Sequence, residues 1–234
     1  MERREELASN LAAVRDRIAS ACERAERSPD ELTLVVVTKT RPASDVALLA
    51  ELGVTDVGEN RHPEADDKQR EALQLGANLR WHFVGGLQTN KAGAVARYAD
   101  VVHSLDRAKL ARSLDRGAAA AERTLRCLIQ VDFDTTDPGR AGVPPHEVAA
   151  LAEVVVGECP HLELGGVMTV APLGQDPAPS FARLREIGAE LVRDVPTATT
   201  ISAGMSEDFE VAIQHGATHL RVGRSVLGQR PVLQ

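Results

Sequence analysis

Cysteine is scarce in this sequence and follows no recognisable pattern. The 234 residues include only Cys22, Cys127 and Cys159, an odd number without a CxxC pair. A disulfide framework requires paired cysteines and a structural zinc site requires closely spaced ligands, so the sequence predicts neither. The histidines show no metal-ligand spacing with carboxylates or cysteines either, and we expect no metal catalysis.

Long apolar runs and an excess of basic charge are also missing. No apolar run approaches the roughly 20 residues that a membrane span needs, and the charged N-terminus (MERREE) does not have the pattern of a signal peptide. The formal net charge of -7 and the pI of about 5.5 argue against a nucleic-acid-binding face. We therefore expect a cytoplasmic protein with no membrane or nucleic-acid partner, although a few local donors could still bind a small anion.

Short β-branched runs alternate with longer amphipathic stretches along the whole chain, and 43% of the residues are hydrophobic. An opening helix is expected over residues 5–27. Eight strand-and-helix units over residues 1–234 predict a single (β/α)8 barrel domain with an extra N-terminal helix. An open doubly wound sheet would give a similar alternation and stays open as an alternative. The expected strands are residues 32–38, 55–58, 81–85, 101–104, 125–133, 164–169, 197–202 and 218–222.

Lys39 closes the first expected strand, after a run of buried aliphatic residues. In a barrel, the residues at the carboxyl ends of strands face the active site. Burial at the edge of an apolar core favours the neutral amine of a lysine, which can form a Schiff base with an aldehyde. A lysine that reaches from a strand end into solvent would have the same spacing, so the pattern alone does not decide between the two.

The loops after the seventh and eighth strands predict an anion site. Phosphate sites in barrels often lie in these two loops, and the start of a helix offers unpaired N–H groups to an anion. A capped helix start with Ser206 as the N-cap, together with an ordinary turn glycine, is the alternative. The candidate residues are Ser202, Ala203, Gly204, Met205 and Ser206 in the first loop and Gly223 in the second.

Two polar side chains fall inside expected strands. Arg221 lies between apolar neighbours and requires an acceptor if it is buried. The ring nitrogen of a bound heterocycle could serve, as could a carboxylate in a structural ion pair. His82 could be either a hydrogen-bonded residue of the barrel interior or a reactive group, and His103 at the end of the fourth strand also stays a candidate.

Several segments together resemble the YggS/PROSC family of pyridoxal 5'-phosphate (PLP) homeostasis proteins, and the resemblance covers nearly the whole length. Any one segment would be weak evidence, but their order and spacing are specific. The segments are VVTKTRP (36–42), GENR (58–61), WHFVG (81–85), LQTNK (87–91), HSLDR (103–107), GVMT (166–169), SAGMS (202–206) and RVG (221–223).

The resemblance implies a barrel of the alanine racemase type without the further domain of those enzymes. It implies that Lys39 holds PLP as a Schiff base and that Arg221 faces the pyridine nitrogen. Asn60 and His82 would line the ring pocket, and the phosphate would lie against Gly223 and the loop of Ser202, Gly204, Met205 and Ser206. The family is associated with the intracellular supply of PLP, so PLP-dependent apoenzymes are the expected recipients.

The sequence departs from the family pattern at four places. Ala203 stands where methionine is usual, and Arg224 stands where a small hydroxyl residue is more common. Arg224 could contact phosphate or point to solvent. His62-Pro63 interrupts the usual continuation after GENR, and Gly86 varies within an otherwise intact segment.

The residues favour a PLP binder over an enzyme. PLP is the best electron sink when its ring nitrogen is protonated, and an arginine can only donate to that nitrogen. Racemases of this fold use a second acid/base tyrosine, whereas this chain has only Tyr98, in an expected helix. We expect a monomeric PLP carrier. The alternatives are a slow fold-type III racemase or lyase, and an aldolase that uses Lys39 without PLP.

Overall fold

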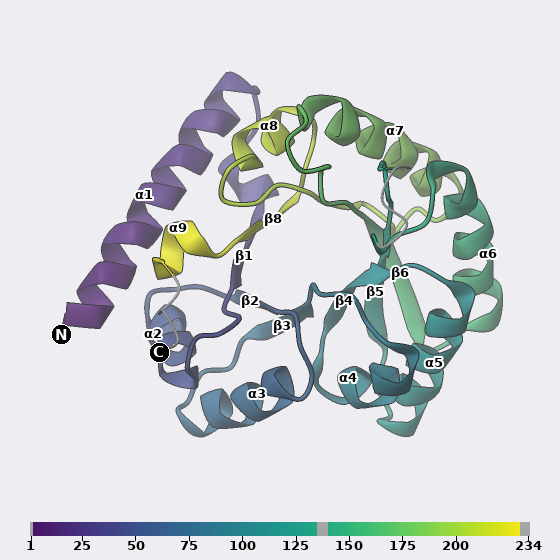
Figure 1. Cartoon of the computed structure of the whole chain (residues 1–234), viewed down its shortest axis with the longest axis horizontal. Helices are drawn as coiled ribbons and strands as arrows, with labels where there is room; N and C mark the ends of the chain where they lie inside the picture. The colour runs from purple at the N-terminus through teal and green to yellow at the C-terminus, as the bar shows by residue number, and fades with distance from the viewer. Residues whose placement is uncertain (1, 135–139, 230–234) are drawn as a thin grey trace.

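The strands of the chain close into a barrel. The structure, a computed structural model, describes residues 2–134 and 140–229. Within this part of the chain, eight parallel strands pair in sequence order, and β8 pairs again with β1 (Figure 1). This closure confirms the predicted (β/α)8 class and excludes the open doubly wound sheet. The strands are β1 (Thr33–Val37), β2 (Asp56–Glu59), β3 (Arg80–Phe83), β4 (Val101–Leu105), β5 (Leu125–Gln130), β6 (Leu162–Met168), β7 (Thr200–Ser202) and β8 (His219–Val222).

Helices surround the barrel in a ring (Figure 1). Three short 3-10 helices, at Pro29–Glu31, Thr89–Lys91 and Pro145–Glu147, precede β1, α4 and α6. The α-helices are α1 (Glu2–Arg24), α2 (Ala43–Glu51), α3 (Glu64–Gln74), α4 (Ala92–Tyr98), α5 (Ala108–Ala120), α6 (Val148–Glu158), α7 (Ala178–Asp194), α8 (Phe209–Gln214) and α9 (Arg224–Leu227).

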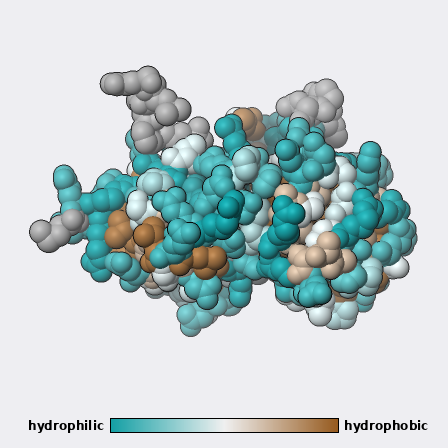
Figure 2. Space-filling view, turned by 90° about the horizontal axis from the view of Figure 1, so that it is seen from below, coloured by the Kyte–Doolittle hydropathy of each residue, from teal (hydrophilic) through white to brown (hydrophobic). Residues whose placement is uncertain are grey.

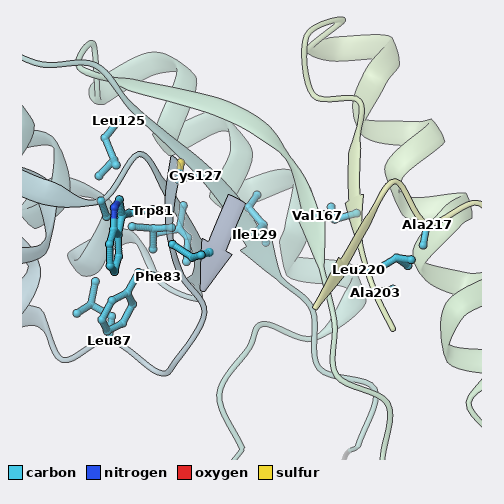
Figure 3. Close-up of a cluster of buried hydrophobic side chains, with 14 of the residues drawn as sticks. Trp81, Phe83, Leu87, Leu125, Cys127, Ile129, Val167, Ala203, Ala217 and Leu220 are labelled. Carbon is cyan, nitrogen blue, oxygen red and sulfur yellow. The ribbon is translucent and has the colours of Figure 1, made fainter. Parts of the chain in front are cut away.

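The main apolar core lies between the barrel and the helix ring. Because successive side chains of a strand point to opposite faces, β3 places Trp81 and Phe83 in this core and turns His82 to the other face. Figure 3 shows both aromatic rings beside Leu87, which follows β3 in the chain. A smaller apolar cluster of Val101, Leu128 and Met168 is separate from this core.

The extra N-terminal helix α1 covers one side of the ring. Its buried residues Leu7, Leu11, Val14 and Ile18 recur at intervals of three and four, which forms one apolar stripe on a helix. Figure 1 shows α1 outside the ring, beside α8 and α9, and it packs against both. The predicted opening helix is therefore confirmed.

Several predicted boundaries differ from the structure. Strand β1 ends at Val37, so Lys39 lies in the turn beyond it, and β5 ends at Gln130. The helix expected from residue 206 begins only at Phe209, and its N-cap residue is Asp208, so the interpretation of Ser206 as the N-cap is wrong.

The outer surface is mostly polar. Figure 2 shows one face of the molecule, on which hydrophobic residues form small patches within a largely hydrophilic surface. Across residues 2–134 and 140–229, no helix combines the length and the apolar character needed to cross a membrane.

Candidate functional site at the carboxyl end of the barrel

A cavity of about 550 Å³ opens where the carboxyl ends of the strands meet. Its walls come from the ends of β1 and β8 and from the loops that follow β1, β2, β3, β6, β7 and β8. This is the face at which barrel proteins bind their ligands, and the volume is typical of a small-molecule site. Of the predicted site residues, the ones that line it are Lys39, Asn60, Met205, Ser206, Arg221 and Gly223.

Lys39 is the one lysine of the cavity wall. The chain contains four lysines in all. Lys68 is buried on α3, and Lys91 and Lys109 are exposed on the outside of the barrel. Any chemistry that requires an amine from a lysine inside this cavity therefore falls to Lys39, which is half-buried at the wall.

The backbone on both sides of Lys39 is held by hydrogen bonds from α3. Lys68 Nζ donates to the carbonyl of Thr38 at 2.9 Å, and the N–H of Thr40 donates to Glu64 Oε1 at 3.0 Å. Thr40 has φ 64°, a left-handed conformation that is uncommon for a residue with a side chain. These bonds fix the turn that presents Lys39 to the cavity.

A buried ion pair supports this turn. Lys68 Nζ lies 2.6 Å from Glu59 Oε1, which also accepts a hydrogen bond of 2.7 Å from the Thr38 hydroxyl. Burial raises the pKa of Glu59, and the charge of Lys68 opposes that shift. The other oxygen, Glu59 Oε2, is buried with no hydrogen-bond partner in the described part of the chain. The negative charge of Glu59 is therefore compensated by the positive charge of Lys68.

Asn60 is positioned by the absence of a side chain at Gly85. The backbone after β2 and the backbone after β3 approach so closely that a Cβ at Gly85 would lie 2.3 Å from the carbonyl oxygen of Asn60. Any larger residue would displace one of these two loops. Both residues line the cavity, so this close approach sets the shape of its wall.

The loop after β7 turns sharply at Gly204. This residue has φ 90°, and a Cβ there would lie 2.7 Å from the Cβ of Ala212. The N–H of Met205 is already bonded to Asp208 Oδ1 at 2.6 Å. By contrast, the N–H groups of Ser206, Gly223 and Arg224 have no acceptor within residues 2–134 and 140–229. Two loops thus bring unbonded amides to the cavity wall, which suits an anion.

Arg221 lies at the cavity with two of its hydrogen bonds fixed. Its Nη1 donates to Ser202 Oγ at 2.6 Å and its Nη2 to the carbonyl of Thr169 at 2.7 Å. It forms no ion pair within the described residues, so the structural ion pair considered from sequence is not found. Burial lowers the pKa of Arg221 to about 10, and the charge of Asp208 opposes this shift. An arginine has five N–H donors, so some remain for a ligand.

His82, Ser202 and Gly204 do not line the cavity, although sequence reasoning grouped them with it. His82 is buried in the barrel interior, where its Nε2 lies 2.8 Å from Asp56 Oδ1 and its Nδ1 lies 2.8 Å from His103 Nε2. His103 Nδ1 lies 3.0 Å from Ser202 Oγ. Burial lowers the pKa of His103 well below its ordinary value, which favours the neutral ring.

Two of the four departures from the family pattern, Ala203 and Arg224, lie just after β7 and β8. Ala203 is buried and lies beside Leu220 and Ala217 in the core (Figure 3), so its small size changes packing there and not the cavity wall. Arg224 donates to Glu207 at 2.7 Å on the surface, where both side chains are exposed. Its side chain is therefore engaged by a carboxylate in this structure.

Sequence reasoning missed three polar residues that support the site. Asp56 lies at the start of its strand, the end that barrel rules assign to stability. Lys68 has the spacing of an ordinary helix-surface residue, and Asp208 precedes a short helix. Of these three residues, only Asp56 had a signal in the sequence: it is an acidic residue at the start of a buried strand, where it needs a partner. Among the described residues, no group of three or more His, Cys, Asp or Glu side chains could hold a metal ion.

The fold and the cavity define a class: a closed (β/α)8 barrel with a lysine after β1 and amide-rich loops after β7 and β8. The family model described as "Alanine racemase, N-terminal domain" matches residues 9–231. The chain is 42% identical to the "Pyridoxal phosphate homeostasis protein" of Mycobacterium bovis, over 98% of this chain and 95% of the relative. It therefore belongs to the alanine racemase N-terminal domain family and, within it, to the pyridoxal phosphate homeostasis proteins.

Two solved structures place the fold in context. PipY of Synechococcus elongatus PCC7942, in a structure with PLP bound, is 32% identical with a TM-score of 0.79, over 95% of this chain and 100% of that chain. An alanine racemase of Clostridium difficile 630 is 13% identical with a TM-score of 0.73, over 97% of this chain and 57% of the racemase. The second likeness concerns the fold alone, and the racemase extends well beyond the shared barrel.

Proposed function

We propose that this protein binds PLP in the cavity at the carboxyl end of the barrel and serves in PLP homeostasis, with Lys39 as the attachment point. The observation that carries the proposal is the position of Lys39, the one lysine at the cavity wall in a chain with four lysines. The relatives named pyridoxal phosphate homeostasis protein and the PLP-bound structure of PipY support it.

The donors at the cavity match the chemistry of PLP. The unbonded N–H groups of Ser206, Gly223 and Arg224 suit a phosphate, which needs several donors at once. Arg221 offers a cation with spare donors, and Val37 and Val84 supply apolar wall for an aromatic ring. A volume of about 550 Å³ is sufficient for a molecule of this size. The residues present therefore fit the group.

Each residue has a distinct role in this proposal. When bound, PLP would supply an aldehyde, and Lys39 is the residue whose amine would hold it as a Schiff base. Asn60 and Met205, which line the cavity, would flank the ring, and Arg221 would donate toward its nitrogen. We assign the phosphate to the amides of the two loops. Ser202, Gly204 and His82 lie outside the cavity lining. Ser202 accepts a hydrogen bond from Arg221, His82 reaches Ser202 through His103, and Gly204 shapes the loop after β7.

We propose a binder and not an efficient catalyst. Arg221 can donate a hydrogen bond but cannot supply a proton at ordinary pH, which weakens the electron sink. A racemase needs a second acid/base, and Tyr98 is buried on α4, stacked on His62, outside the cavity lining. Burial also raises the pKa of Tyr98, which makes it a poor base.

Further expectations accompany this proposal. One domain spans the chain, since the family match runs from residue 9 to residue 231. The protein is monomeric and works in the cytoplasm, where the three free and buried cysteines remain reduced. PLP-dependent apoenzymes receive the cofactor.

A titration with PLP tests the binding proposal. Visible absorbance of the protein-bound chromophore should saturate at one PLP per chain in the wild type and in Lys91→Ala, and should be lost in Lys39→Ala. Pyridoxal, which lacks the phosphate, should bind far more weakly. The loaded protein should deliver PLP to an apoenzyme and should not racemise or cleave amino acids. Sustained turnover that Lys39→Ala abolishes would instead establish a slow racemase or lyase.

A further inference from the structure

Five polar side chains form a continuous line of hydrogen bonds across the inside of the barrel. Asp56, His82, His103, Ser202 and Arg221 come from β2, β3, β4, β7 and β8, and each lies within 3.0 Å of the next. All five are buried, with exposed fractions of 0–5%. We call this line the interior relay.

Strand register explains why these residues meet. His82 is paired with Val101, and His103 lies two residues further along β4 on the same face. Ser202 is paired with His219, and Arg221 lies two residues further along β8. Side chains two residues apart on a strand share a face, so the register brings the interior residues of the neighbouring strands β3 and β4, and of β7 and β8, together. The contact between His103 and Ser202 instead crosses the barrel interior from β4 to β7.

The two ends of the interior relay fix its direction. Arg221 can only donate, and the ionised carboxylate of Asp56 can only accept. Burial acts to raise the pKa of Asp56, but hydrogen bonds from His82 and Thr55 together hold this pKa below its usual value. His82 Nε2 must therefore carry a proton for Asp56, and Ser202 Oγ must accept from Arg221.

The middle of the relay then has one arrangement in which every proton finds an acceptor. With Nε2 of His82 protonated, its Nδ1 accepts from Nε2 of His103. Nδ1 of His103 is left bare and accepts the hydroxyl proton of Ser202. The reverse arrangement would place both Arg221 and His103 as donors on Ser202 Oγ, and the hydroxyl proton would have no acceptor among the described residues.

We infer that Asp56, His82 and His103 are positioning residues that turn the lone pairs of the Ser202 hydroxyl toward Arg221 and so fix the plane of its guanidinium at the cavity. The inference rests on the proposed function only for the identity of the ligand. Asp56 sets the direction of the hydrogen bonds in the relay and is not the counter-charge of Arg221, because the charge that acts on Arg221 is that of Asp208. The carbonyl of Thr169 fixes the second Nη, so two of the five donors are committed and three remain.

Nitrogen NMR of the full-length protein without PLP tests the relay directly. Nε2 should be protonated and Nδ1 bare in both His82 and His103. The two Nη groups of Arg221 should give separate signals, because both are held. A proton on Nδ1 of either histidine, or averaged Nη signals, would overturn the inference.

Variants test the direction that Asp56 imposes. Asp56→Asn keeps the shape but adds a donor, which permits the reversed relay, so both tautomers of His82 and His103 should be populated. Asp100→Asn is the matched control, because Asp100 bonds to the backbone of Trp81 and lies outside the relay; it should leave both tautomers unchanged. Unchanged tautomers in Asp56→Asn would contradict the proposed role.

The hydroxyl of residue 202 provides the link to ligand binding. Ser202→Ala should average the Nη signals and raise the PLP dissociation constant by about tenfold, the effect of one lost hydrogen bond, whereas Ser202→Thr should restore both. The tautomers are read without PLP. If the protein binds no PLP, the proposed function is refuted and the inference about the relay stands. If the wild-type relay is reversed, the inference about the relay is refuted and the proposal that the protein binds PLP stands.

Discussion

Replacement of Lys68 by methionine should destabilise the fold far more than loss of an ordinary helix-surface charge. Lys68 and Glu59 are only 6% and 1% exposed, and their Nζ–Oε1 distance is 2.6 Å. Removal of one partner of a buried ion pair leaves an uncompensated charge and costs about 3–5 kcal/mol. Here Glu59 Oε2 already lacks a partner among the described residues, so only the hydrogen bond from the neutral Thr38 hydroxyl would remain to the carboxylate.

Urea unfolding followed by circular dichroism measures this effect. Arg70→Met is the matched control on the same helix, because its ion pair with Asp67 is exposed on both sides, and it should cost no more than about 1 kcal/mol. The double variant Lys68→Met/Glu59→Gln removes both buried charges and should be more stable than Lys68→Met alone. Equal losses in Lys68→Met and Arg70→Met would refute the reasoning.

The same substitution should also weaken PLP binding. Lys68 holds the Thr38 carbonyl, and the ion pair supports the turn that presents Lys39. Measured at a temperature where both variants are folded, the PLP affinity of Lys68→Met should fall, and that of Arg70→Met should not. An unchanged affinity in folded Lys68→Met would show that Lys39 does not depend on this support.

Three further predictions concern the loops and the barrel interior. Gly204→Ala should cost at least about 1–3 kcal/mol in urea unfolding, because φ is 90° and the new Cβ would lie 2.7 Å from Ala212 Cβ; Gly157→Ala on α6, where nothing lies within 4 Å, should be neutral or slightly stabilising. Gly85→Ala should lower PLP affinity because its Cβ would displace Asn60. Burial lowers the pKa of His219 to about 4 from 6.5, so the unfolded chain binds more protons between these values. Stability from His219 should be fully present above about pH 6.5 and fall by about 3 kcal/mol toward pH 4, and His219→Gln should reduce this slope.

Each of these predictions has an outcome that would contradict it. A Gly204→Ala protein as stable as Gly157→Ala would show that the loop after β7 relaxes easily. Full PLP affinity in Gly85→Ala would mean that the position of Asn60 is not critical. An identical slope of unfolding free energy against pH in wild type and His219→Gln would remove His219 as the cause.

The barrel was predictable because its signal is repeated along the chain. Alternating strand and helix patterns and the position of Lys39 after a buried run depend only on local sequence. The start of α8 was mispredicted because both Ser206 and Asp208 are good N-cap residues, and local sequence does not show which one the loop uses. Asp208 takes the N-cap position of α8, but its side chain accepts a hydrogen bond from the N–H of Met205 and not from the helix.

The interior of the barrel was not predictable to the same degree. Sequence reasoning left His82 open between interior and reactive roles, because the choice depends on register with β2 and β4. Its contacts with Asp56 and His103 join residues 26 and 21 positions away. Lys68 was missed for the same reason: a lysine on a polar helix normally faces solvent, and only the close approach of Glu59 explains its burial.

Borohydride reduction of the PLP-loaded protein, followed by peptide mass spectrometry of the adduct, tests most directly whether Lys39 holds PLP. We predict one adduct, on Lys39, in the wild type and in Lys91→Ala, and no adduct at that position in Lys39→Ala. An adduct on Lys68, Lys91 or Lys109 in the wild type, or a protein that takes up no PLP, would contradict the central claim that this cavity holds PLP through Lys39.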